Sequence, residues 1–160
     1  MGNTTIIKKG DIQVMSGGTG VMHSEFNKND DRLVKFLQIW VYPNKRNVTP
    51  RYDQITLDAS QRNNKFQQIL SPSQDDEGVW IHQDAWFHLG RFDQDFVTDY
   101  KVKKAGNGVY AFIIKGSVSI DGQELESRDG LGIWDITNLE IKATSPETEI
   151  LLMDVPMMLS

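Results

Sequence analysis

His23 and Glu25 are the residues of this sequence whose types and spacing best suit chemistry. They stand one residue apart in the stretch GGTGVMHSEF, directly after three glycines. Glycines permit a sharp turn and a close approach to a neighbouring strand, after which we expect residues 21–26 to be extended. In an extended segment, residues i and i+2 point to the same face. We therefore predict that the imidazole and the carboxylate point into one space, where they could supply two ligands for Fe, Mn, Ni, Cu or Zn.

A competing interpretation is that the His-x-Glu pair is a hydrogen-bonded or surface pair without a metal. The glycines match neither a dinucleotide-binding fingerprint nor a phosphate-binding loop, and no G-x-S-x-G turn is present. The chain has no cysteine, so a metal would have to be held by His, Asp or Glu. The other two histidines, His82 and His88, are too far apart along one straight strand to share an ion. We expect each of them at the surface or at the edge of a core.

The composition is that of an ordinary globular protein, with 39% hydrophobic and 24% charged residues among 160. No apolar run is long enough to cross a bilayer, and the absence of an export signal at the start predicts a cytoplasmic protein. Residues 1–50 carry 7 basic and 4 acidic groups, whereas residues 51–160 carry 10 and 18. Most of the surface would therefore repel a phosphate backbone, which argues against nucleic-acid binding and favours a protein partner.

Short β-branched or aromatic runs, separated by Gly, Asp, Asn or Pro, recur along the chain and predict an all-β protein. Turn sequences such as IDGQ and SRDG are typical of hairpins. The polar stretch NKRNVTPRY predicts a boundary between a small N-terminal piece, residues 1–45, and a larger C-terminal domain, residues 46–160. The predicted strands are residues 4–8, 12–16, 34–43, 53–58, 79–83, 85–92, 99–104, 109–116, 117–122, 130–136, 139–144 and 148–156.

One polar side chain lies inside the predicted strand of residues 34–43. Gln38 would share a strand face with Phe36 and Trp40, so its amide could point into an N-terminal cavity and contact a substrate. The alternative is that Gln38 is satisfied by hydrogen bonds within a barrel wall.

Sequence runs along the whole chain resemble the pirin family of the bicupin superfamily. In order, the matching runs are GDIQVMSGGTGVMHSE, LQIWVYP, TPRYDQ, LSP, IHQD, IIKGSVSIDG, DGLGIWD and EILLMDVP. The resemblance implies two cupin barrels, each a jelly roll of antiparallel strands, with one metal, usually iron, in the N-terminal barrel. The family's ligands are an early His-x-His pair and a later His-x-Glu pair, and the later pair corresponds to His23 and Glu25. The earlier pair has no counterpart, because this sequence begins at a point that would lie after it.

The resemblance leads us to expect a complete C-terminal barrel, from about Tyr52 to Pro156, and a partial N-terminal barrel. Roughly the first third of a pirin would be absent, so the chain would be truncated. Two ligands leave most of a cation's coordination to water, so we expect iron or another divalent metal to bind weakly or not at all. Because missing strands would leave open sheet edges, we also expect a homo-oligomer.

Two functions are implied by the resemblance. The complete family form would be a metal-dependent quercetin 2,3-dioxygenase, an oxidoreductase acting on a flavonol or similar small aromatic substrate, with Gln38 as a candidate substrate-binding residue. This chain alone would be inactive, because half of the ligand set is missing. The alternative is a non-enzymatic module that regulates a protein partner by binding it.

Overall fold

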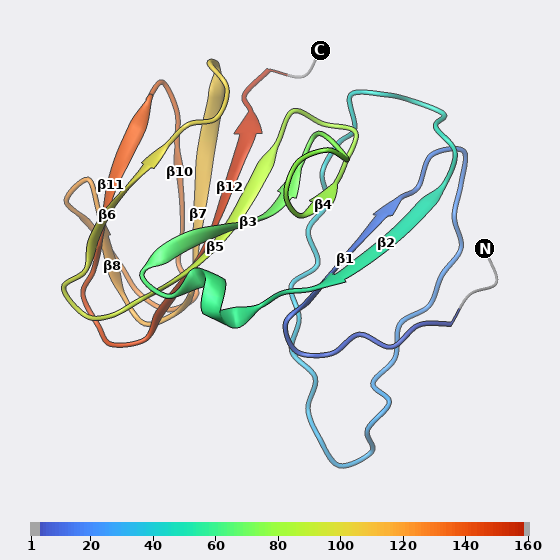
Figure 1. Cartoon of the computed structure of the whole chain (residues 1–160), viewed down its shortest axis with the longest axis horizontal. Coiled ribbons are helices and arrows are strands. Elements are labelled where there is room, and N and C mark those ends of the chain that lie inside the picture. The colour runs from blue at the N-terminus through green and yellow to red at the C-terminus, as the bar shows by residue number, and fades with distance from the viewer. Residues whose placement is uncertain (1–3, 159–160) are drawn as a thin grey trace.

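The computed structural model describes residues 4–158, which form three β-sheets and one short 3₁₀ helix, η1 (Ala59–Arg62) (Figure 1). β1 (Asp11–Ser16) and β2 (Arg51–Thr56) form an antiparallel pair. The six-stranded sheet has the order β10–β7–β12–β5–β3–β4, with β10 (Gly130–Ile133), β7 (Asn107–Lys115), β12 (Thr148–Pro156), β5 (Trp86–Phe92), β3 (Lys65–Ser71) and β4 (Val79–Trp80). The four-stranded sheet has the order β6–β11–β8–β9, with β6 (Val97–Lys101), β11 (Asn138–Ala143), β8 (Val118–Ile120) and β9 (Gln123–Leu125). Within residues 4–158 no helix is long and apolar enough to cross a membrane.

The two larger sheets enclose the main hydrophobic core, which we call the sandwich core. On β11, Leu139, Ile141 and Ala143 are buried while the residues between them are exposed, which is the alternation of a strand with one face on a core. The facing six-stranded sheet contributes the remaining large side chains. The buried residues of the sandwich core are Phe92, Tyr100, Val109, Ala111, Ile113, Val118, Ile120, Leu125, Leu139, Ile141, Ala143, Ile150 and Leu152.

β12 is apolar on both faces because both of its faces are covered. Ile150 and Leu152 belong to the sandwich core, whereas Leu151 belongs to a second cluster on the opposite face of the six-stranded sheet, which we call the outer core. This double burial explains why EILLMDVP is a nearly continuous apolar run, a pattern that strands covered on both sides adopt. The buried residues of the outer core are Ile69, Leu70, Val79, Ile81, Ala85, Phe87 and Leu151.

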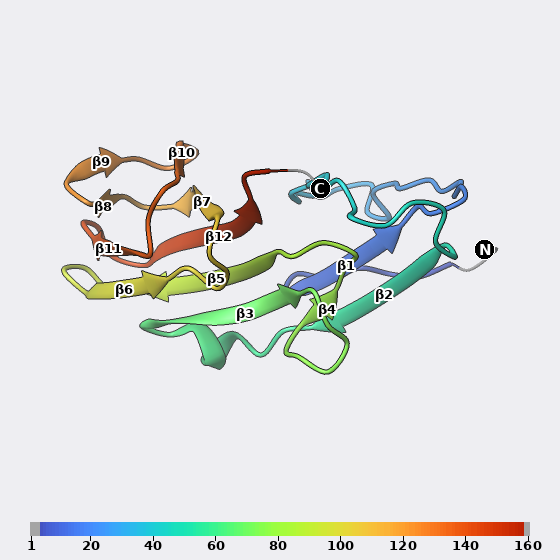
Figure 2. The ribbon, with the colours of Figure 1, turned by 90° about the horizontal axis from the view of Figure 1, so that it is seen from above.

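The β1–β2 pair packs on the outer core. Ile12 and Val14 of β1 and Ile55 of β2 contact it with the same strand face. At the end of that face the Arg51 guanidinium lies 3.9 Å from the ring centre of Trp80, donates to the Trp80 carbonyl, and forms an ion pair with Asp53. Seen from above, the β1–β2 pair continues the layer of β3 and β4 (Figure 2). The pair is therefore attached to the larger unit by one apolar face, and its other face points away from the outer core.

The predicted all-β class is confirmed, with three corrections. Residues 4–8 and 34–43 form no strand, because in the described part of the chain they take part in no backbone ladder of hydrogen bonds; Thr5 and Ile6 contact β2 through the Tyr52 and Gln54 side chains instead. β3 and β9 were not predicted. In β3, KFQQILS, two adjacent glutamines interrupt the alternation of apolar and polar residues, and β9, QEL, is only three residues long. The described residues of the C-terminal part form two facing sheets rather than one closed ring of hydrogen-bonded strands, and β3 and β4 are parallel.

The predicted boundary after residue 45 stays a prediction. The strand pairing bears on where a boundary would fall, because among residues 4–158 β2 pairs with β1 and with no strand of the larger sheets. β2 would then belong with the N-terminal piece, and the connection through η1 would be the junction.

Candidate functional site

The three glycines before His23 make the tight turn that the sequence predicts. Gly18 has a φ of +52°, and a Cβ at that position would lie 2.0 Å from the Val48 carbonyl oxygen. The same carbonyl accepts a hydrogen bond from the Thr19 N–H at 3.1 Å. The expected close approach is therefore made to the segment just before β2, and only glycine fits there.

The side of the β1–β2 pair that points away from the outer core carries polar side chains from both strands, and we call this side the polar face. Its members are Asp11 and Gln13 of β1 and Tyr52, Gln54 and Thr56 of β2, which alternate with the residues that face the outer core. The Asp11 carboxylate accepts hydrogen bonds from Gln54 at 2.9 Å and from Thr56 at 2.8 Å. The Tyr52 hydroxyl donates to Gln54. The alternation in DIQVMS and RYDQIT was the available signal for this face, but the sequence does not show that these two segments pair.

Glu25 reaches the polar face. Its Oε1 accepts a hydrogen bond from Gln13 Nε2 at 2.6 Å, so the segment after the glycines lies over the polar face. Asp11, on the same face, has a pKa held below its usual range by hydrogen bonds from the Lys8 N–H and then from Thr56. The polar face therefore holds the ionised Asp11 carboxylate on the same strand as Gln13, the residue that donates to the predicted ligand Glu25.

The metal-ligand assignment of His23 and Glu25 stays a prediction. Both side chains are exposed, and residues 21–26 form no strand. The expectation that residues i and i+2 point to the same face, which holds for a strand, therefore does not apply to them. An imidazole and a carboxylate are suitable donors for a divalent transition metal. Within residues 4–158, however, no three His, Asp or Glu side chains come together as a ligand set. The donors fit in type but fall short in number.

Gln38 lies in an exposed, irregular segment. Phe36 is 64% exposed and Trp40 is 88% exposed, so the predicted strand face is not packed against a barrel interior within the described residues. The role of Gln38 in substrate binding stays a prediction. The nearest anchors of this segment are further along, where the Tyr42 carbonyl accepts from Gln83 at 2.8 Å and the Asn44 N–H donates to the His82 carbonyl at 2.7 Å.

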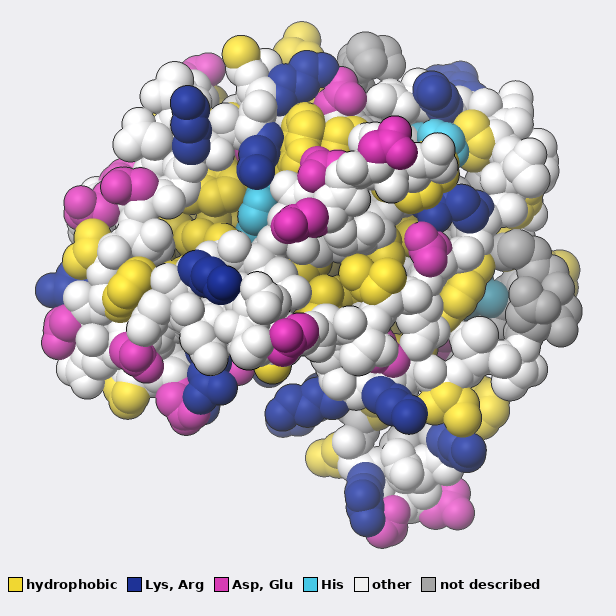
Figure 3. Space-filling model, viewed as in Figure 1, with side chains coloured by type: hydrophobic (Ala, Val, Ile, Leu, Met, Phe, Trp, Pro, Cys, Tyr) yellow, Lys and Arg dark blue, Asp and Glu magenta, His cyan; other side chains and the backbone are white. Residues whose placement is uncertain are grey.

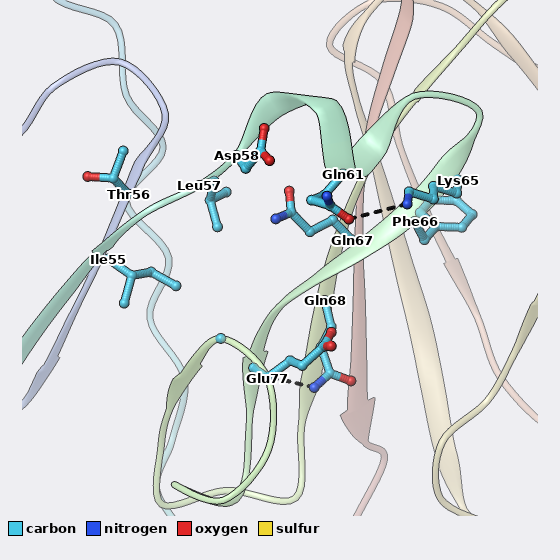
Figure 4. Close-up of a pocket in the computed structure, with 11 residues that line it drawn as sticks. Ile55, Thr56, Leu57, Asp58, Gln61, Lys65, Phe66, Gln67, Gln68 and Glu77 are labelled. Carbon is cyan, nitrogen blue, oxygen red and sulfur yellow. Dashed lines mark hydrogen bonds between the residues drawn. The ribbon is translucent and has the colours of Figure 1, made fainter.

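A cleft of about 530 Å³ lies between the end of β2 and the start of β3. Figure 4 shows Gln67 on β3 pointing across the cleft toward Leu57 and Asp58. Ile55 lies on the same side of the cleft as Leu57 and Asp58. At the rim, Lys65 donates to Gln61 at 3.3 Å. The Gln67 Oε1 atom is buried and has no hydrogen-bond partner among the described residues. The cleft could not be recognised in the sequence, because its walls come from segments on either side of η1.

The sandwich core also contains a buried polar network centred on Asp154. Asp154 is fully buried and accepts hydrogen bonds from the Lys103 N–H at 2.7 Å, the Tyr100 hydroxyl at 3.0 Å and Asn107 Nδ2 at 2.7 Å. His88 Nδ1 lies 3.3 Å from the same hydroxyl. Burial lowers the pKa of His88 from its ordinary value of 6.5 to about 4, and burial beside Asp154 raises the pKa of Tyr100.

This network corrects the expectation for one of the histidines. His88 is only 4% exposed and lies inside the sandwich, whereas His82 is half-buried against the Trp80 ring. The position of His88 follows from β5, where its neighbours Phe87 and Leu89 face the outer core and His88 faces the opposite way.

Comparison with known proteins gives two family matches. Residues 68–155 match the quercetinase C-terminal cupin domain, and residues 1–41 match the pirin family. A quercetin 2,3-dioxygenase of Escherichia coli K12 is 36% identical over 156 residues, which cover 98% of this chain and 65% of that protein. The chain thus spans just under two thirds of the length of that relative.

Solved structures agree with the sequence matches. The crystal structure of YhhW from Escherichia coli has a TM-score of 0.91 at 35% identity, and the match covers 100% of this chain and 66% of YhhW. A structure of the bacterial pirin YhhW in complex with nickel(II) has a TM-score of 0.84 at 34% identity, covering 92% and 62% of the two chains.

Proposed function

The chain belongs to the pirin family of cupin proteins, and on that premise we propose that His23 and Glu25 hold a divalent metal ion at the polar face. The observation that carries the proposal is the contact between Gln13 and Glu25, which places one carboxylate of the His-x-Glu pair over a face lined with hydrogen-bonding side chains. The nickel complex of the relative YhhW supports a divalent cation, and iron is the ion we expect.

The activity proposed for a complete form of this protein is that of a quercetin 2,3-dioxygenase, with a flavonol as the substrate and Gln38 as a contact for it. The named activity of the E. coli relative supports this reaction class. A bound cation would act there as a Lewis acid toward a substrate oxygen. We propose that this chain alone does not turn over quercetin, because two ligands leave the ion exchangeable. A cytoplasmic location stays part of the same proposal.

Metal binding by single variants tests the first proposal. Purified protein is stripped with a chelator and titrated with Ni²⁺ or Fe²⁺ by calorimetry under anaerobic conditions. We expect the His23→Ala and Glu25→Gln variants to bind at least about tenfold more weakly than the parent chain. His82→Ala is the matched control and should bind like the parent. Equal affinity in all four proteins would show that the ion is held elsewhere.

A second candidate function is a non-enzymatic module that binds a protein partner or a second copy of itself. The specific observation that favours it is the apolar surface of the segment between β1 and β2, where Met22, Phe26, Leu33 and Trp40 are each more than 80% exposed. Part of this segment forms the protrusion at the bottom of Figure 3, which carries basic side chains beside apolar ones. Tight stoichiometric metal together with quercetin turnover would rule out this second function as the main one.

A further inference from the structure

His23 and Glu25 offer two donors to an ion that needs more, and a second copy of the chain can supply the rest. We propose that one divalent metal ion is shared between two copies, each of which contributes His23 and Glu25. This inference rests on the proposed function of the pair and adds the partner that completes its ligand set. The shared site holds two imidazole nitrogens and two carboxylates around one ion at a two-fold axis.

The described part of one chain does not complete the ligand set. Divalent transition metals in proteins take four or more ligands, yet among residues 4–158 no three His, Asp or Glu side chains come together. His88 is 4% exposed inside the sandwich, and His82 packs against the Trp80 ring. The Asp11 carboxylate on the polar face already accepts three hydrogen bonds. Further ligands are therefore water or come from another molecule.

The surroundings of the pair favour a protein surface over water. Both ligand side chains are exposed, and the residues on either side of them, Met22 and Phe26, are 95% and 81% exposed. Large apolar side chains that lie open to solvent gain stability when a second surface covers them. An ion held by the pair therefore lies within a surface that association would bury.

A second copy suits the pair because it brings the same donors and the same apolar neighbours. A two-fold interface is self-complementary, so each contact that one copy makes is made again by the other. Two Glu25 carboxylates balance the two positive charges of the ion, so the buried site carries no net charge. Gln13 donates to Glu25 Oε1 at 2.6 Å, which orients the carboxylate and leaves Oε2 for the ion.

A shared ion couples metal binding to association. Without metal, the two Glu25 carboxylates approach each other as like charges, which weakens the dimer. With metal, both carboxylates are attracted to the same ion. Because the ion binds the paired chains better than a single chain, it shifts the equilibrium between monomer and dimer toward the dimer.

Stoichiometry and mass test the shared site. Protein without a histidine tag is stripped with a chelator and titrated with Ni²⁺ by calorimetry, and its mass is followed by sedimentation equilibrium with and without Ni²⁺. We expect one Ni²⁺ for every two chains, and a dimer that dissociates at least about tenfold less readily when the ion is present. One Ni²⁺ per chain without any change in association, lost in His23→Ala, would overturn the sharing and leave the proposed metal site intact.

Variants separate the sharing of the ion from its binding. In His23→Ala and Glu25→Gln, Ni²⁺ should no longer tighten the dimer. Without metal, Glu25→Gln should associate at least as tightly as the parent chain, because the repulsion between the two carboxylates is gone. His82→Ala is the matched control and should keep both the stoichiometry and the effect of Ni²⁺ on association.

Two further results would count against the proposal. If Ni²⁺ tightens the dimer equally in His23→Ala and in the parent chain, the ion bridges the two copies elsewhere and the shared site is overturned. If the parent chain binds no Ni²⁺ at all, the proposed metal site fails together with its sharing.

Discussion

Asp154 is the single residue on which most of the buried polar contacts depend. Its carboxylate holds three donors from two segments, the Lys103 N–H, the Tyr100 hydroxyl and the Asn107 amide, all inside the sandwich. We expect Asp154→Ala to lower the free energy of unfolding by roughly 3 kcal/mol or more, because these donors would be left buried without an acceptor. Urea denaturation measures the change. Asp99→Ala, at an exposed position on β6, is the control and should change stability by less than about 0.5 kcal/mol.

His88 makes stability depend on pH. Burial lowers its pKa in the folded chain from 6.5 to about 4, so between these values the unfolded chain binds a proton that the folded chain does not. Stability is therefore fully present above pH 6.5 and is lost as the pH falls toward 4. The loss from this one group should be about 2 kcal/mol between pH 7 and pH 5.

The His88→Gln variant isolates that contribution. Urea denaturation at pH 7 and pH 5 should show a smaller loss in the variant than in the parent chain, by about 2 kcal/mol. Taking the difference between the two proteins cancels the contribution of His82, whose pKa is also lowered by burial. The same pH dependence in both proteins would contradict the assignment of this effect to His88.

The residues that meet at the sites show how far the sequence could predict them. The pair of His23 and Glu25 was visible because its two members are neighbours in the chain. Gln13 and Tyr52 on the polar face come from strands 39 positions apart, and that pairing is fixed only by the fold. Asp154 did leave a signal, as the one carboxylate well inside an apolar strand, where a buried charge needs partners.

Gly78 and Gly122 both lie in turns and both have a positive φ, but their surroundings differ. Gly78, just before β4, has a φ of +90°, and a Cβ there would lie 2.3 Å from the carbonyl carbon of Ile69. Gly122, between β8 and β9, has a φ of +84°, with nothing within 4 Å of such a Cβ. Gly122→Ala should cost about 1 kcal/mol, the strain of a positive φ alone.

Gly78→Ala should cost about 3 kcal/mol or more, because the overlap with the β3 backbone adds to the same strain. The overlap would push β4 away from β3 and open the cleft beside Gln67, which Gly78 also lines. Thermal unfolding of both variants measures the difference. Equal costs at the two positions would show that β3 and β4 adjust without loss.

At the level of strands, the sequence predicted best where a strand is paired and alternates. β11 and β12 were predicted within a residue of their observed bounds, because burial of one face or of both produces a recognisable pattern. Residues 34–43 carry the composition of a strand but pair with no strand in the described chain, and composition cannot report whether a pairing partner exists. β3 is the reverse case: it pairs with β5 along most of its length, but its two glutamines interrupt the pattern by which a strand is recognised in the sequence.

The sandwich and the N-terminal segment differ in how much apolar side chain they expose to solvent. The sandwich buries its apolar side chains between sheets, whereas residues 22–42 expose a group of large apolar side chains on an irregular segment. β1 and β2 pair only with each other, so in residues 4–158 both have a free edge. Free edges and contiguous apolar surface both favour association, the first through backbone hydrogen bonds and the second through loss of water contact.

We therefore expect a two-fold homodimer in which the N-terminal segments of two copies cover each other. A second copy is the simplest occupant, because it is always present and a two-fold axis buries the same apolar group twice. Sedimentation equilibrium at micromolar concentration should give the mass of a dimer. The double variant Phe36→Ser and Trp40→Ser should dissociate at least about tenfold more readily, since each removed side chain is a large exposed apolar group.

The matched control changes exposed apolar side chains elsewhere on the molecule, with Val97→Ser on β6 and Trp134→Ser after β10. These replacements make the surface more polar by a similar amount but lie on the sandwich, so the control should remain a dimer. If both double variants dissociate alike, general surface polarity rather than the N-terminal segment governs association. A parent chain that sediments as a monomer, with residues 22–42 resistant to proteolysis, would show that the segment closes on its own chain and needs no second copy.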